Sequence, residues 1–180
     1  MSNQPLLLSE SLEETGTTVL FTNLVSLDKE KIVQTIKEEF FWFLELNKKH
    51  NYEIIIDSIP LVYEDIVEHR EKIDISELSL SHSHEIEFIH WKISLGNEFS
   101  RFYFIDSNNH EQYKETTKLN KKSDNFHHSV YLSSDYWNDF SFEPLKMEGQ
   151  QGVFPNRTSD EFKVLCNYLN IHLTKFRKDF

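Results

Sequence analysis

The sequence predicts an α+β fold: a single domain in which a mostly antiparallel sheet of about five strands carries two long helices packed on one face. Two long segments repeat apolar residues at three- and four-residue spacing, and several short segments are rich in β-branched and aromatic residues. No linker or internal repeat divides the chain. At 180 residues it is long enough for one hydrophobic core and short for two, so residues 1–180 are expected to form one domain.

The N-terminal part is predicted to hold a strand followed by the first long helix. Residues 17–26 are β-branched and apolar enough for a strand, and residues 1–16 are either its hairpin partner or a loose arm. Asp28 offers an N-cap to a helix at 29–49. The apolar stripe of this helix consists of Ile32, Ile36, Phe40, Phe43 and Leu44.

The middle of the chain is predicted to alternate between strand and helix. Residues 52–57 are dense in isoleucine, which favours a central strand. Residues 60–73 read as a short helix with Leu61, Ile66 and Ile73 facing inwards. On its outer side, Glu64 and Glu68 would stack like charges at i,i+4 spacing, which contributes nothing to folding and therefore suggests function.

The next segments are predicted to form a hairpin, a loop and a further strand. A strand at 84–95 is followed by a tight turn at Gly96-Asn97, and 98–106 returns as its hairpin partner. Residues 107–125 are mostly polar and read as a long loop. Residues 126–133 form another strand.

The C-terminal helix is predicted at 159–177. Thr158 and Glu161 have the spacing of a capping box. The inward stripe consists of Phe162, Leu165, Leu169, Leu173 and Phe176. Cys166 lies beside that stripe, so we interpret it as a small core residue rather than a nucleophile. It is the only cysteine, which excludes an internal disulfide and a zinc cage built from cysteines.

The charge of the chain is unevenly distributed. The net charge is −11, and residues 1–100 carry 19 acids against 8 bases, whereas 101–180 carry 11 of each. Residues 53–87 alone hold ten acids against Arg70 and Lys72. A field of this sign repels nucleic acid and anionic membranes and attracts a basic partner. The alternative is a solvated surface that only maintains solubility.

Composition also bears on origin and compartment. The N-terminus lacks the basic and apolar regions of a secretory signal, and no run approaches the ~18–20 apolar residues of a membrane span. A cytoplasmic setting is therefore expected. Alanine is absent and glycine occurs four times, while lysine, asparagine and isoleucine are plentiful. This bias suggests an AT-rich genome, bacterial or phage.

The stretch HSHEIEFIHW, residues 82–91, raises the question of a metal or acid–base site. On a strand, His82 and His84 point the same way, and His127 or His128 from a neighbouring strand could supply a third imidazole for zinc. Glu85 points to the opposite face. The competing interpretation is a strand covered on both faces, or one whose phase a bulge switches, with the histidines at its polar end. We favour this second interpretation and predict no metal or other cofactor.

The sequence lacks a glycine-rich phosphate loop, a nucleophile elbow and a zinc-protease helix, and it predicts no catalytic residues. Enzymatic activity is not expected. The leading hypothesis is an acidic binding protein, of the inhibitor or immunity type, that neutralises a basic toxin or nuclease. One alternative is a metal- or His-dependent hydrolase centred on His82 and His84. Another is a non-catalytic regulatory subunit of phage or mobile-element origin. The predicted partner-binding residues are Glu64, Asp65, Glu68, Glu71, Asp74 and Glu77, with Tyr63, Tyr136 and Trp137 as aromatic anchors.

Overall fold

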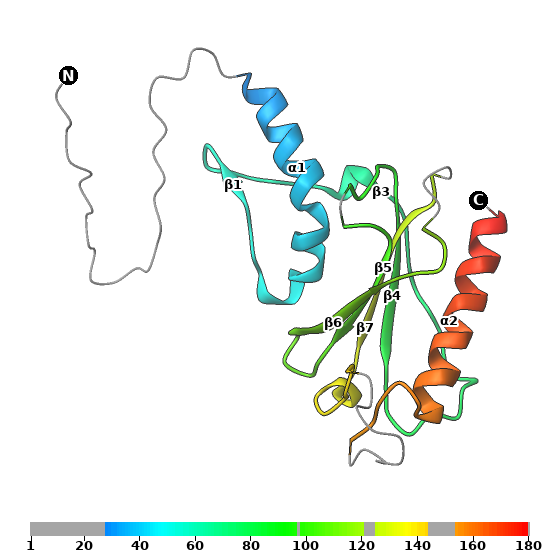
Figure 1. Ribbon diagram of the computed structural model, residues 1–180. Coiled ribbons are helices and arrows are strands. Elements are labelled where there is room, and N and C mark those ends of the chain that lie inside the picture. The colour runs from blue at the N-terminus through cyan, green and yellow to red at the C-terminus, as the bar shows by residue number, and fades with distance from the viewer. Residues whose placement is uncertain (1–27, 97, 121–124, 144–153, 180) are drawn as a thin grey trace, which may run out of the picture.

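The computed structural model describes residues 28–96, 98–120, 125–143 and 154–179 (Figure 1). It contains two α-helices, a two-stranded hairpin and a five-stranded sheet. The helices and strands are α1 (Lys29–Leu46), β1 (Ile55–Ile56), β2 (Ile59–Pro60), β3 (Val67–Lys72), β4 (Glu85–Trp91), β5 (Arg101–Ile105), β6 (Glu111–Thr116), β7 (His127–Ser133) and α2 (Asp160–Asp179). Short 3-10 turns lie at Lys48–His50, Glu64–Ile66 and Asp135–Trp137. The predicted α+β class is confirmed.

The five-stranded sheet has the order β3-β4-β7-β5-β6. All neighbours pair antiparallel except β5 and β7, which are parallel. The prediction of a mostly antiparallel sheet of about five strands is therefore confirmed. β3 and β6 form its two edges, and both carry charged side chains along their length, an arrangement that discourages edge-to-edge aggregation.

The two long helices cover opposite faces of the sheet, so the prediction that they share one face was wrong (Figure 1). α1 packs Phe41 against Trp91, with ring centroids 4.7 Å apart, in a cluster that includes Tyr103 and Tyr131. The leucines of α2 belong to a separate cluster, together with sheet residues that point the other way: Ile86, Phe88, Phe102, Phe104, Val130 and Leu132. Side chains alternate between faces along a strand, and each face is buried by its own helix.

β4 explains the mixed pattern of the HSHEIEFIHW stretch. Phe88 belongs to the α2 cluster, whereas Ile89 and Trp91 belong to the α1 cluster. All three are fully buried. The interpretation of a strand covered on both faces is thus confirmed, and no change of phase is needed, since the register with β7 runs unbroken from Glu85 to Trp91.

The ends of the helices agree only in part with the sequence prediction. Asp28 caps α1, because its side chain accepts from the amide of Lys31 at 3.1 Å. At the start of α2 the predicted capping box is wrong: the Thr158 hydroxyl donates to Asn156, and Glu161 turns away to accept from His82 and His84. The apolar stripe of α2 is confirmed, with Phe162, Leu165, Leu169 and Leu173 buried and Phe176 partly buried.

The segment 52–73 differs most from the prediction. The expected central strand is reduced to β1, which pairs only with β2 in a hairpin whose Ile55 and Ile59 are exposed. The expected helix at 60–73 is instead a 3-10 turn followed by the edge strand β3. Ile66 and Ile73 are buried as predicted, and Leu61 is half-buried.

Two further predictions need correction, and one lies outside the described residues. The segment after β4 does not return as its hairpin partner: β5 pairs with β6 and β7. The stretch 107–125 is not one long loop, because β6 occupies part of it. The predicted strand at 17–26 and the arm at 1–16 fall outside the described residues. Within the described part of the chain, no helix has the length and apolar character needed to cross a membrane.

Candidate functional site

The carboxylates predicted to bind a partner do not lie along a helix, and two of them contact cations of the molecule. Asp65 forms an ion pair with Lys37 at 2.5 Å, and Glu64 lies 3.3 Å from Arg70. The hydrogen bond from Lys37 holds the pKa of Asp65 below its usual range. Both side chains are exposed, so these pairs contribute little to stability. Lys37 offsets the charge of Asp65, whereas Arg70 also binds Glu45 and Glu87 and offsets the charge of Glu64 only in part.

The other four predicted carboxylates follow one another along β3 and the loop after it. Glu68 lies at the irregularity between Val67 and His69, and Asp74 accepts from the amide of Ser76 at 2.8 Å. Glu71 contacts only imidazoles, His172 at 2.8 Å and His69 at 3.4 Å. Within the described residues, no lysine or arginine pairs with any of the four: Glu68, Glu71, Asp74 and Glu77. We call these four residues the acidic row.

The predicted aromatic anchors are not exposed. Tyr136 and Trp137 are buried in the α2 cluster, at 4% and 1% exposure, so their assignment to a partner surface was wrong. Tyr63 is half-buried and donates its hydroxyl to Glu45 at 2.9 Å. Tyr168 on α2, which the sequence did not single out, is the aromatic residue beside the acidic row. Its hydroxyl donates to the main-chain oxygen of Asp74 at 2.9 Å, and partial burial and Glu77 raise its pKa.

Arg70 joins the edge of the sheet to α1. Its guanidinium contacts Glu45 at 2.6 and 2.8 Å and Glu87 at 2.8 Å. Burial works to raise the pKa of Glu45, but the hydrogen bonds and charge of Arg70 outweigh it and hold that pKa below its ordinary value. Since charge-assisted bidentate pairs fix geometry strongly, this network positions β3 against α1 rather than presenting a free cation.

His82 and His84 converge on a carboxylate that the sequence did not associate with them. Glu161, in the first turn of α2, accepts from the amide and imidazole of His82 and from the imidazole of His84 at 3.0 Å. Burial lowers the pKa of His84, against the opposing effect of Glu161. The Nδ1 atom of His84 is buried and has no hydrogen-bond partner among the described residues. The three groups tie the β3–β4 loop to α2.

His127 and His128 cannot complete a metal site with His82 and His84. In the β4–β7 register, His127 faces Trp91 at one end while Ser133 faces Glu85 at the other, which separates the two pairs by roughly 20 Å of strand. His128 is fully buried and hydrogen-bonds to Thr117 at 2.9 Å. Among the described residues, no three His, Cys, Asp or Glu side chains are arranged to hold a metal ion.

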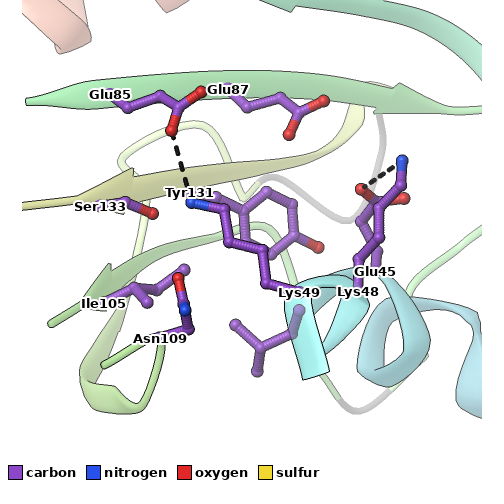
Figure 2. Close-up of a pocket in the computed structure, with 10 residues that line it drawn as sticks. Glu45, Lys48, Lys49, Glu85, Glu87, Ile105, Asn109, Tyr131 and Ser133 are labelled. Carbon is purple, nitrogen blue, oxygen red and sulfur yellow. Dashed lines mark hydrogen bonds and ion pairs between the residues drawn. The ribbon is translucent and has the colours of Figure 1, made fainter. Parts of the chain in front are cut away.

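A pocket opens where the end of α1 meets the sheet, on the face opposite α2 (Figure 2). It has a volume of about 510 Å³, counted to its open mouth. Leu46, Ile105 and Tyr131 supply its apolar lining, and Lys48 and Lys49 project over it from the 3-10 turn that follows α1. Figure 2 shows the side chain of Lys49 extending past the Tyr131 ring to its ion pair with Glu85.

The fold and these sites define an acidic α+β protein with a two-faced sheet. No protein-family model, curated protein or solved structure matches this chain at a significant level.

Proposed function

We propose that this protein binds a basic protein partner through the acidic row, as an inhibitor of the immunity type would bind a toxin or nuclease. The observation that carries the proposal is that Glu68, Glu71, Asp74 and Glu77 have no lysine or arginine partner among the described residues. Elsewhere on β3 and β4, carboxylates such as Glu87 are paired with arginine or lysine. The row is thus a local excess of negative charge on a chain whose net charge is −11.

The mechanism is electrostatic. Four carboxylates along one edge would pair with lysine and arginine side chains that the partner otherwise turns towards phosphate. Complementary charge of this kind accelerates association and selects partners more than it adds affinity. Screening by salt weakens it over a length of about 10 Å at 0.1 M ionic strength, so association should slow as salt rises.

Tyr168 supports the row as its aromatic contact. Interfaces concentrate binding energy in a few tyrosine, tryptophan and arginine residues surrounded by polar contacts. Tyr168 is half-buried on α2, and its hydroxyl already contacts the loop that carries Asp74. Its ring therefore costs little entropy to fix when a partner docks.

The hydrolase alternative has less support. Glu161 is occupied by hydrogen bonds from His82 and His84, and within the described part of the chain neither imidazole hydrogen-bonds to a hydroxyl or thiol. We interpret the three residues as a structural tie. The regulatory-subunit alternative would predict no salt-sensitive partner, and the experiment below distinguishes it.

The test is affinity capture from the native host with the wild-type protein and two triple variants. The first variant reverses the row, with Glu68→Lys, Asp74→Lys and Glu77→Lys. The second makes the same change in net charge at exposed acids remote from the row, Glu30→Lys, Glu39→Lys and Glu53→Lys. We expect the wild type and the second variant to retain a basic protein at low salt and to release it as salt rises, and the first variant to lose it. Equal retention by both variants would refute the proposal.

A further inference from the structure

β3 is an edge of the five-stranded sheet, and one side of its backbone is unpaired. Among the described residues, β4 is the only strand that pairs with it. The amide of Ile73 donates to the main-chain oxygen of Ile86 at 2.9 Å, and successive residues of an antiparallel strand point their backbone groups to alternate sides. Counted from this pair along the register with β4, the N–H and C=O groups of Arg70 and Lys72 point away from the sheet. We call these groups the open edge, since a further strand can pair with them.

Two carboxylates of the acidic row lie beside the open edge on the α2 face of the sheet. Glu71 contacts His172 of α2 at 2.8 Å, so its side chain points to that face. The charge of Glu68 acts on His90, whose ring lies near Phe176 of α2, which indicates that Glu68 lies on the same side. Neither carboxylate has a lysine or arginine partner among the described residues. This face of the edge therefore presents carboxylates to a partner.

On the α1 face, the charges beside the open edge are paired within the molecule. Arg70 binds Glu45 and Glu87, and Lys72 binds Glu85 at 2.6 Å. A strand added to β3 would therefore meet carboxylates on one face of the sheet and ion pairs on the other. Since side chains alternate between faces along a strand, a strand that fits this edge carries basic residues at every second position.

The same charges discriminate among the strands that could pair with β3. Like charges directly opposite one another on two strands destabilise the pairing, and opposite charges stabilise it. An acidic strand would oppose Glu68 and Glu71 with further carboxylates and be repelled. A strand with alternate lysine or arginine residues would pair with both of them while its backbone bonds to the open edge.

We propose that the basic partner adds an extended segment to β3 as a sixth strand, with lysine or arginine at alternate positions facing Glu68 and Glu71. The inference rests on the proposed function and deepens it, because it names the form that the partner takes at the acidic row. In this mode of binding, hydrogen bonds to the backbone of Arg70 and Lys72 supply affinity, and the alternate side chains supply specificity.

The probe is the peptide Thr-Lys-Thr-Lys-Thr-Lys-Thr with blocked ends, titrated into the full chain and followed by calorimetry and amide hydrogen exchange. Its control has the same composition in blocks, Lys-Lys-Lys-Thr-Thr-Thr-Thr. Two further versions of the alternating peptide carry N-methyl groups, either on the three lysines or on the threonines that follow them. Only every second residue of a paired strand points its N–H at the neighbouring strand, so one N-methylated version loses these hydrogen bonds and the other keeps them.

We expect saturable binding of the alternating peptide, and binding of the block peptide that is weaker by about five-fold or more. One N-methylated version should bind about ten-fold more weakly or worse, and the other within about two-fold of the parent peptide. On binding, the amides of Arg70 and Lys72 should become protected from hydrogen exchange. The amide of Ile73, which already donates to Ile86, should change little.

The carboxylates are tested by Glu68→Gln combined with Glu71→Gln, which keeps the shape of both side chains and removes their charge. This variant should bind the alternating peptide about five-fold more weakly or worse. The matched control, Glu30→Gln with Glu39→Gln at exposed positions of α1, removes the same charge away from the edge and should bind as the wild type does.

Two results would overturn the inference while the proposed function stands. One is binding that needs Glu68 and Glu71 but is affected equally by both N-methylated versions, without protection at Arg70 and Lys72. The other is no saturable binding of the alternating peptide, or equal binding of the block peptide, by a protein that still captures a basic partner through the acidic row. If the capture experiment also retains no basic protein, the proposed function and the inference both fail.

Discussion

Arg70, on the edge strand β3, binds the buried carboxylate of Glu45, on α1, through two hydrogen bonds of 2.6 and 2.8 Å. Glu45 is 5% exposed, so without Arg70 its charge would keep only the Tyr63 hydroxyl at 2.9 Å and the 3.7 Å contact with Lys48. We predict that Arg70→Ala lowers the free energy of unfolding by about 3 kcal/mol, the lower end of the range for one broken partner, because Arg70 is itself partly exposed. Urea unfolding followed by circular dichroism measures this loss.

The companion variant Arg70→Ala with Glu45→Gln separates the buried charge from the lost packing. Removing the charge should recover a substantial part of the stability, since the amide can stay hydrogen-bonded to Tyr63 without a counter-ion. Lys163→Ala, whose contact with Asp160 is long and exposed, is the matched control and should unfold like the wild type. An Arg70→Ala variant as stable as this control would show that the network is dispensable.

The burial of His84 makes the protein less stable in acid. Burial lowers the pKa of His84, so between its folded pKa and the unfolded value near 6.5 the unfolded chain binds more protons. The stabilisation is complete above about pH 6.5 and is lost as the pH falls through the folded pKa. The pKa of Glu161 is also lowered, so its stabilisation is lost at still lower pH. The groups facing His84 are Glu161, His82 and Asp135.

Urea midpoints measured at about pH 7.5 and pH 5.5 test this expectation. The urea midpoint of the wild type should be lower at about pH 5.5 than at about pH 7.5. In His84→Gln, whose amide can still donate to Glu161, the fall should be smaller. Burial also lowers the pKa of His90, so a residual dependence should remain and should shrink further in His90→Gln. An identical decrease of the urea midpoint in the wild type and both variants would contradict the assignment of this pH dependence to His84 and His90.

Cys166 should be unreactive while the protein is folded. Burial raises the pKa of its thiol to about 12, so almost no thiolate exists near neutral pH. We expect the thiol reagent DTNB to titrate no thiol in the native protein at pH 8 and one thiol after unfolding in guanidinium. Fast reaction of the native protein would mean that this side chain is more accessible than its contact with the α2 cluster implies.

The elements that the sequence predicted well are those whose signal is local. The stripe of α2 repeats leucine at four-residue spacing, and Asp28 is a strong N-cap, so both helices could be located from periodicity and capping alone. β7 has the strand-forming residues Val130, Tyr131 and Leu132 at its centre and was located from this local signal. Which face each helix covers depends on contacts between distant segments, and no local pattern encodes it. The sequence therefore predicted the helices but not their arrangement.

β3 and β6 were missed because edge strands carry little hydrophobic alternation. In β3 both faces present charged or polar side chains, since Arg70 points towards Glu45 while Glu71 points towards His172. The spacing of the acidic residues within 60–73 therefore resembled the spacing on the polar face of a helix. Contacts between distant segments also determine which charges of the candidate site are paired. Glu45 lies 25 residues from Arg70, and Asp65 lies 28 residues from Lys37, so no rule of spacing connects these partners. Glu161 lies 77 residues from His84 for the same reason.

The arrangement of helices on opposite faces can be tested by the additivity of core substitutions. Leu169→Ala on α2 should cost about 2–5 kcal/mol, and Phe41→Leu on α1 about 1–2 kcal/mol, since both side chains are fully buried. Because they belong to separate clusters across the sheet, their effects should add to within about 0.5 kcal/mol. Leu165→Val with Leu169→Ala is the matched pair within one cluster, and these neighbours at i,i+4 spacing should couple more strongly. Strong coupling between Phe41 and Leu169 would instead place both helices against one core.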